Sequence, residues 1–222
     1  THGKRIVSTA PILAANEAVL RRRFPFVHNR LAQVADRTSD DCFYEKTNAG
    51  LRLFIRKGEK HFPAYGEKKP EKLIERWLSN LVLTPESLYG VSGFGDGSHL
   101  KSFLEDTPVA TNIFAAEKDP ALLRETLTLI DVSSLLANER FFLGVGEPDD
   151  EFFRDIETVA LNGVRNVDSI VFSPLYSLDE SYYDRMRNEM MRQYLVIRPL
   201  IEVNVRTAIN IQENTLKNLT LL

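Results

Sequence analysis

The spacing of hydrophobic and polar positions changes twice along the chain, and it predicts three parts. Residues 1–70 begin with two short helical segments, and alternating runs separated by glycine turns then predict a small antiparallel β-meander. Residues 71–178 alternate apolar runs with amphipathic segments, which predicts parallel strands joined by helical crossovers. Residues 179–222 carry an apolar stripe at helical spacing, which predicts a helical segment kinked or divided at Pro199.

These elements predict the fold class. We expect an α/β protein whose central domain has a Rossmann-like (methyltransferase-like), mostly parallel sheet, with an N-terminal helix plus a small antiparallel β-meander before it and a C-terminal helical segment after it. The strands expected in the parallel sheet are Leu88–Ser92, Val109–Ala116, Phe141–Val145 and Ser169–Ser173. The helices expected around these parts include Ala14–Arg23, a helix that starts near Pro120, and Asp150–Leu161.

The two ends of the sequence suggest a piece of a longer protein. The chain starts at Thr1 rather than at Met, and the apolar stripe of the third part continues to Leu222 without a glycine stop or a polar tail. We therefore expect the helical segment to lead into a further domain downstream.

Composition narrows the classes of partner and the compartment. The 222 residues include 28 Lys and Arg against 31 Asp and Glu, a formal net charge of −3, which disfavours a nucleic-acid partner. The apolar runs fall far short of the roughly 20 residues that span a bilayer, so we expect no membrane partner. A single cysteine, Cys42, excludes an internal disulfide framework and favours a reducing compartment, so we expect a cytoplasmic protein.

A glycine cluster carries the main chemical signal. Gly93, Gly95 and Gly97 follow a predicted strand and open a predicted helix, an arrangement in which backbone N–H groups can approach an anionic ligand. Glu117 ends the next strand, twenty residues after Gly97, where a Rossmann-type site places an acid that binds ribose hydroxyls. We predict that these four residues bind a nucleotide or an S-adenosylmethionine-type ligand. The alternative is a tight structural turn with Glu117 as a solvated strand end.

Residues beside the glycine cluster and after the last predicted strand bear on the kind of ligand. Ser98 occupies the third glycine position of the strict dinucleotide pattern, and the carboxylate of Asp96 would repel a phosphate at the turn. Residues 173–176, Ser-Pro-Leu-Tyr, weakly resemble the Asp/Asn-Pro-Pro-Tyr element of amino-group methyltransferases. An S-adenosylmethionine-dependent methyltransferase-like domain therefore remains an alternative.

The residue types typical of hydrolytic enzymes and metal sites form no recognised motif or ligand spacing in this sequence. The four histidines are scattered without metal-ligand spacing, and the sequence contains no G-x-S-x-G elbow and no Walker loop. We predict no catalytic residue and no metal ligand, and enzymatic activity of this chain stays an open question.

Five segments along the chain match the motifs of one known family in order. They are residues 16–25 (an opening helix with a basic end and a proline), 93–100 (G-x-G-x-G-Y-H-L in the family), 116–119 (Ile-Glu-Pro-Asp), 173–176 (His-Pro-x-Tyr) and 214–217 (Asn-Thr-Leu-Lys). This order resembles the N-terminal half of the motility accessory factor family, bacterial flagellin glycosyltransferases of the domain-of-unknown-function 115 group. Asp96, Ser98 and Lys118 depart from the usual residues of that pattern.

This resemblance implies a role and a set of partners. The family transfers a nonulosonic (sialic-acid-like) sugar to Ser or Thr of flagellin, and its transferase chemistry belongs to the domain that follows, whose Gly-Pro-Ser loop has no match here. The chain would be a non-catalytic or nucleotide-binding N-terminal domain, with flagellin or the downstream domain as partner and a sugar nucleotide and a second copy of the chain as further candidates. A structural or partner-binding domain with a vacant site is the remaining alternative.

Overall fold

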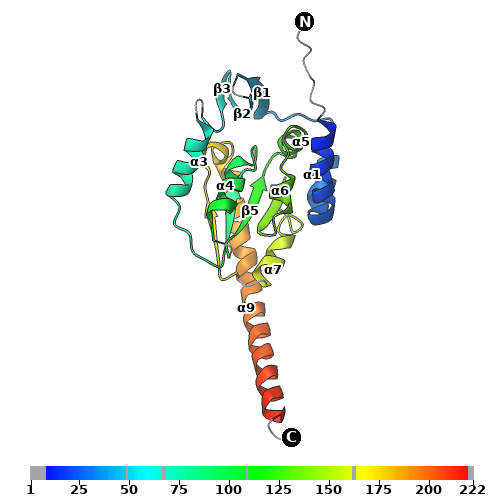
Figure 1. The fold of residues 1–222 in the computed structure, drawn as a ribbon, viewed down its shortest axis with the longest axis vertical. Helices are drawn as coiled ribbons and strands as arrows, with labels where there is room; N and C mark the ends of the chain where they lie inside the picture. Colours follow the sequence, from blue (N-terminus) through cyan, green and yellow to red (C-terminus); the bar gives the residue numbers. More distant parts are fainter. Residues whose placement is uncertain (1–8, 49, 67–68, 109, 162–163, 220–222) are drawn as a thin grey trace.

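The computed structural model describes residues 9–219 except 49, 67–68, 109 and 162–163 (Figure 1). The strands among these residues are β1 (Cys42–Thr47), β2 (Gly50–Lys57), β3 (Lys60–Pro63), β4 (Ser87–Ser92), β5 (Asn112–Glu117), β6 (Phe141–Val145) and β7 (Asn166–Ile170). The helices are α1 (Ala10–Arg23), α2 (Pro25–Ala32), α3 (Pro70–Ser79), α4 (Ser98–Asp106), α5 (Pro120–Leu129), α6 (Ser133–Ala137), α7 (Arg154–Leu161), α8 (Ser173–Tyr176) and α9 (Glu180–Leu219).

The larger sheet is parallel and has the strand order β6-β5-β4-β7. The chain therefore moves outward from β4 through β5 to β6 and then returns to the other side of β4. This reversal creates a topological switch point between β4 and β7, and ligands of open α/β sheets bind at the carboxyl edge of such points. The predicted mixed α/β fold class, with a mostly parallel sheet and a small antiparallel one, is confirmed.

Helices cover both faces of this sheet, as the short buried strands require. Odd-numbered positions such as Val91 and Ile113 pack with α1, α2, α4, α5 and α6. Even-numbered positions such as Leu88 and Phe114 pack with α7 and the first turns of α9, where Met186 is buried. Beyond these turns α9 extends away from the globular part (Figure 1).

The smaller sheet closes the carboxyl edge of the larger one. Strands β1, β2 and β3 form the predicted antiparallel meander, with Cys42 opposite Ile55 and Ile55 opposite Phe62. Its inner residues Leu53 and Ile55 join a third apolar cluster with Phe172 and Leu175, which follow β7. The meander therefore lies over the loops where a ligand of the larger sheet would enter.

The structure differs from the predicted elements at three places. Pro199 lies inside α9 and does not divide the C-terminal segment, which is one helix from Glu180 to Leu219. The fourth parallel strand ends at Ile170 rather than at Ser173, because Pro174 lies in the first turn of α8 and fits a helix start. The second parallel strand begins at Asn112, and its predicted start at position 109 lies outside the described residues.

A buried amide links α1 to the end of α5. The Asn16 side chain is fully buried, and its Nδ2 donates to the carbonyls of Leu127 and Ile130, both at 2.8 Å. Its Oδ1 accepts from the N–H of Val132 at 3.0 Å. These bonds pair backbone groups at the end of α5 that would otherwise be buried without partners.

We expect Asn16→Ala to lower the free energy of unfolding by about 2 kcal/mol, because it leaves one buried N–H and two carbonyls without this partner. Urea denaturation followed by circular dichroism measures the change. Glu17→Ala is the matched control on the same helix, since Glu17 makes only a solvent-exposed ion pair with Arg21 and should cost about 0.5 kcal/mol. Equal losses in the two variants would contradict the anchoring role of Asn16.

Candidate functional site

The structure brings the four predicted ligand residues together at the carboxyl edge of β4 and β5. Gly93, Gly95 and Gly97 have φ values of 78°, 55° and 81°, a left-handed backbone that glycine adopts at least cost. Gly97 then caps the start of α4. Glu117, the last residue of β5, reaches across to this turn. The structure therefore places the glycines and Glu117 at one turn, and the ligand expected for them stays a prediction.

The buried Glu117 carboxylate accepts hydrogen bonds from the protein's own backbone. It is 2% exposed, and its Oε2 accepts from the N–H groups of Phe94 at 2.9 Å and Gly95 at 3.4 Å. Its Oε1 accepts from the N–H of Asp119 at 3.0 Å. Burial raises the pKa of Glu117 to about 7, although these hydrogen bonds oppose the rise. The alternative interpretation of Glu117 as a solvated strand end is therefore wrong, because the side chain is buried.

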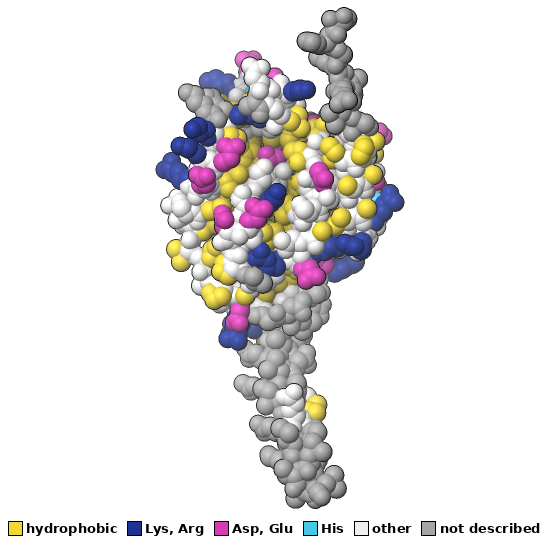
Figure 2. All heavy atoms as spheres, in the orientation of Figure 1, with side chains coloured by type: hydrophobic (Ala, Val, Ile, Leu, Met, Phe, Trp, Pro, Cys, Tyr) yellow, Lys and Arg dark blue, Asp and Glu magenta, His cyan; other side chains and the backbone are white. Residues whose placement is uncertain are grey.

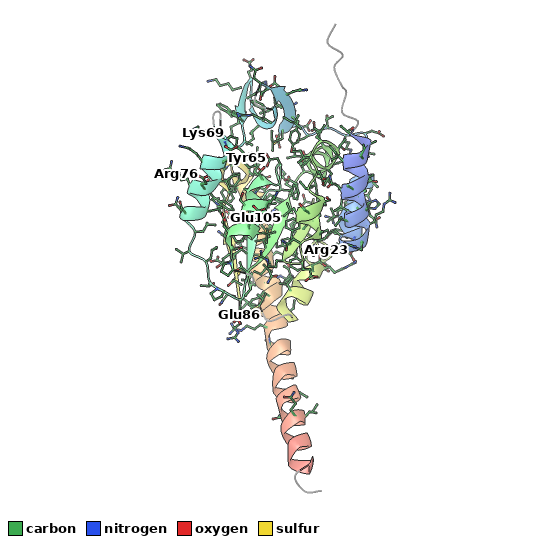
Figure 3. All side chains as sticks on the ribbon, viewed as in Figure 1. Arg23, Tyr65, Lys69, Arg76, Glu86 and Glu105 are labelled. Atoms are coloured by element: carbon green, nitrogen blue, oxygen red, sulfur yellow. The ribbon has the colours of Figure 1, made fainter. Side chains whose placement is uncertain are left out.

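Two other side chains cover the glycines. A Cβ atom added at Gly93 would lie 2.6 Å from Cβ of Leu175, and one added at Gly95 would lie 2.5 Å from Oη of Tyr65. Leu175 belongs to α8 and is 1% exposed, and Figure 3 shows Tyr65 between the small sheet and α4. The glycines thus allow a close approach by the protein's own side chains. Those side chains fill the switch point between β4 and β7.

Tyr65 also connects the turn to a buried histidine. Its hydroxyl lies 2.9 Å from Nδ1 of His99 and accepts from the N–H of Asp96 at 3.2 Å. His99 stacks on Phe172 with ring centroids 4.3 Å apart. Burial lowers the pKa of His99 to about 3, so the imidazole is neutral at physiological pH. The Tyr65 hydroxyl and Nδ1 of the neutral His99 therefore share one hydrogen bond, in which either group can be the donor.

Sequence reasoning missed Tyr65, Leu175 and His99 as parts of this site. His99 follows the glycine turn directly, so its position was a signal that could have been used. Tyr65 comes from the end of the meander, more than twenty residues before the turn, and Leu175 follows the last strand of the sheet. Leu175 lies in the Ser-Pro-Leu-Tyr segment, but that motif gives no sign of a contact with the glycine turn. Only the packing around the two sheets shows that Tyr65 and Leu175 both reach the turn.

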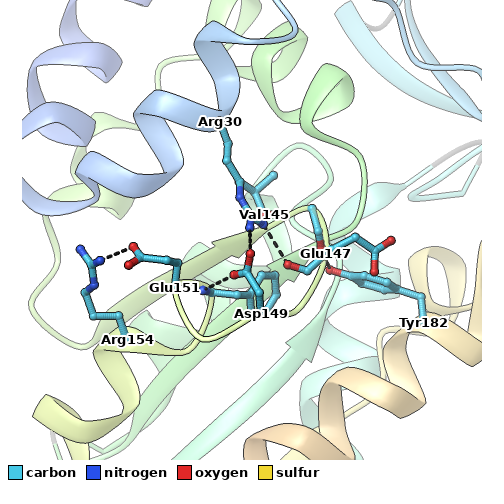
Figure 4. Close-up of polar contacts among 9 residues, drawn as sticks. Arg30, Val145, Glu147, Asp149, Glu151, Arg154 and Tyr182 are labelled. Carbon is cyan, nitrogen blue, oxygen red and sulfur yellow. Dashed lines mark hydrogen bonds and ion pairs between the residues drawn. The ribbon is translucent and has the colours of Figure 1, made fainter.

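The next loop along the carboxyl edge is held by an arginine (Figure 4). Arg30 of α2 donates from Nη1 to the carbonyls of Val145 at 2.6 Å and Glu147 at 2.8 Å, and it pairs with Asp149. The Tyr182 hydroxyl donates to the Gly146 carbonyl at 2.6 Å. The acidic residues after β6 are therefore partly neutralised, and their loop is tied to α2 and α9.

The described part of the chain shows neither a metal cluster nor a membrane span. No group of three or more His, Cys, Asp or Glu side chains among those residues is arranged to hold a metal ion. None of the helices described there is both long and apolar enough to cross a bilayer.

Comparisons with known proteins yield one structural neighbour. No family model and no curated protein matches the sequence. Among solved structures, the MAf glycosyltransferase from Magnetospirillum magneticum AMB-1 matches this chain with a TM-score of 0.44 and 16% sequence identity. The match covers 82% of this chain and 35% of that protein, so the chain corresponds to about a third of the neighbour's length.

Proposed function

We propose that this chain is a non-catalytic N-terminal domain of a cytoplasmic flagellin glycosyltransferase, an enzyme that transfers a nonulosonic sugar to Ser or Thr of flagellin. The domain would dock flagellin or the downstream domain, and it would itself perform no chemistry. The order of motifs along residues 16–217 supports the family assignment. The internal hydrogen bonds of the glycine turn support a docking role over nucleotide binding. The N–H groups of Phe94 and Gly95 already donate to Glu117, and that of Asp96 donates to Tyr65, so they are not available to a nucleotide.

The nucleotide-binding role of Gly93, Gly95, Gly97 and Glu117 is the alternative within this proposal. It requires α8 to move away so that Leu175 leaves the switch point, and it requires Glu117 to release the N–H groups of the turn. An S-adenosylmethionine-dependent methyltransferase would need the same movement. A measurement of ligand binding at the glycine turn therefore tests both alternatives.

Thermal melting of the purified chain tests that turn. S-adenosylmethionine, S-adenosylhomocysteine, NAD and cytidine nucleotides at millimolar concentration should leave the melting temperature unchanged, because a ligand stabilises the native state only if it binds there. Leu175→Ala opens the crevice and serves as the comparison variant. A rise in melting temperature for wild type with any of these ligands would overturn the closed turn and favour the nucleotide-binding alternative.

A second experiment tests the docking role directly. The chain is immobilised and exposed to unglycosylated flagellin, and the pair is then incubated with a cytidine-activated nonulosonic acid. We expect saturable binding of flagellin and no mass increase of flagellin by mass spectrometry. Absence of binding both to flagellin and to the separately expressed downstream domain would contradict docking. A mass gain of one sugar would place the transfer chemistry in this chain.

A further inference from the structure

A cavity of about 350 Å³ lies beside the closed glycine turn. It opens between the small sheet, the first turn of α3 and the start of α4, within the size range of roughly 300–1,000 Å³ typical of small-molecule sites. Its lining includes Leu51, Arg52, Tyr65, Glu71, Asp96 and Ser98. Tyr65 separates this cavity from the switch point, so the cavity is a distinct space at the same edge of the larger sheet.

The cavity is poorly suited to a phosphate or another anion. Asp96 Oδ1 accepts from the N–H of Ser98 at 2.9 Å, so the protein's own carboxylate occupies the place where the start of α4 would attract an anion. Glu71, in the first turn of α3, adds a second carboxylate to the wall. The carboxylates of Asp96 and Glu71 would repel an anionic group in this space.

The remaining groups do not favour a simple cation either. The guanidinium of Arg52 lines the cavity and donates to the Gly66 carbonyl at 3.4 Å, so a fixed positive charge lies on the wall formed by β2. The floor adds no charge, since Tyr65 and His99 are both neutral and hydrogen-bonded to each other. Figure 2 shows acidic and basic side chains interspersed on this face of the globular part.

The lining thus combines hydrogen-bond donors, hydrogen-bond acceptors and apolar side chains. Arg52 and the Ser98 hydroxyl can donate, Asp96 and Glu71 can accept, and Leu51 offers an apolar contact. Hydroxyl groups both donate and accept, and a sugar ring carries several of them around an apolar C–H face. We propose that this cavity binds a neutral polyhydroxylated ligand with the size of one or two sugar rings. This inference goes beyond the docking role and does not depend on it.

Saturation-transfer NMR on the intact chain tests the proposal. The probes are methyl glycosides of glucose, galactose and N-acetylglucosamine, with inorganic phosphate and butylammonium as charged comparisons. We expect saturable binding of at least one glycoside, and we expect Asp96→Asn to weaken it about tenfold, because a hydrogen bond to a charged acceptor is about twice as strong as one to a neutral acceptor. Asparagine keeps an Oδ1 that can accept from the N–H of Ser98, so this variant should fold.

Two further variants locate the ligand. Leu51→Trp fills the cavity from β2 and should abolish binding, whereas Glu75→Gln, an exposed change on α3 outside the lining, should leave the affinity unchanged. If Leu51→Trp is unfolded by circular dichroism, Glu71→Gln replaces it, with a loss of affinity expected. Three results would each overturn the proposal. The first is no glycoside binding at tens of millimolar, and the second is stronger binding of phosphate or butylammonium than of any glycoside. The third is glycoside binding that persists in Leu51→Trp. Flagellin docking is measured without glycoside. A negative result in one experiment therefore does not affect the other proposal.

Discussion

Replacing Gly93 by alanine is expected to lower the free energy of unfolding by about 2–5 kcal/mol. The added methyl group would lie 2.6 Å from Cβ and 2.7 Å from Cδ1 of Leu175, which is a fully buried side chain with little room to move. Overpacking of this kind costs about 1–3 kcal/mol. The left-handed backbone, with φ at 78°, adds about 1–2 kcal/mol for a residue that carries Cβ. Urea denaturation of the purified variant measures the total.

A second glycine separates these two costs. Gly66 has nearly the same backbone, with φ at 82°, but a Cβ atom added there meets nothing within 4 Å. Gly66→Ala should therefore cost only the backbone strain, about 1–2 kcal/mol. Similar losses of unfolding free energy in Gly93→Ala and Gly66→Ala would mean that Leu175 does not pack tightly against the turn. They would contradict the closure of the switch point by this side chain.

The pH dependence of stability is expected to report on Glu117. Burial raises its pKa to about 7 in the folded protein from the ordinary value of 4.5, so between these pH values the folded state binds more protons than the unfolded state. The stability contributed by the protonated carboxyl is fully present below pH 4.5 and is lost as the pH rises through 7. The full shift corresponds to a loss of about 3 kcal/mol across this window.

Glu117→Gln isolates this contribution because glutamine has nearly the same shape and does not titrate. Asp96, Glu125 and Asp155 also have raised pKa values, so the wild-type curve alone is a sum of several groups. The difference between the wild-type and Glu117→Gln unfolding free energies, measured in urea from pH 4.5 to 8, should change by about 3 kcal/mol. Parallel curves would show that Glu117 titrates equally in the folded and unfolded states.

Several elements could be predicted from sequence because their signals are local. The strand Phe141–Val145 was predicted with its observed bounds, since a short apolar run is typical of a strand buried on both faces. The helix start at Pro120 was also predicted, and Asp119 caps it by accepting from the N–H of Ala121 at 2.8 Å. The short helices α6 and α8 were not predicted, because four or five residues carry too little periodicity.

The candidate site was predicted in part. The glycines and Glu117 were placed together on their spacing alone, and they do meet at one edge of the sheet. Their surroundings could not be predicted in the same way. The burial of Glu117 depends on the N–H groups of a turn more than twenty residues away, and a spacing rule gives no sign of whether a carboxylate faces a ligand or the protein.

The sequence by itself determined the α/β class, the turn that needs glycine, and most strand and helix positions, because these follow from side-chain periodicity and local backbone preference. Only the tertiary structure decided the strand order β6-β5-β4-β7 and the identity of the groups that cover the turn. Tyr65 and Leu175 both reach Gly95 although they lie far apart in the sequence, because the meander and α8 both bury apolar side chains at the carboxyl edge of the sheet. Burial of that apolar surface is not directional, so no short stretch of sequence specifies which distant segments will meet there.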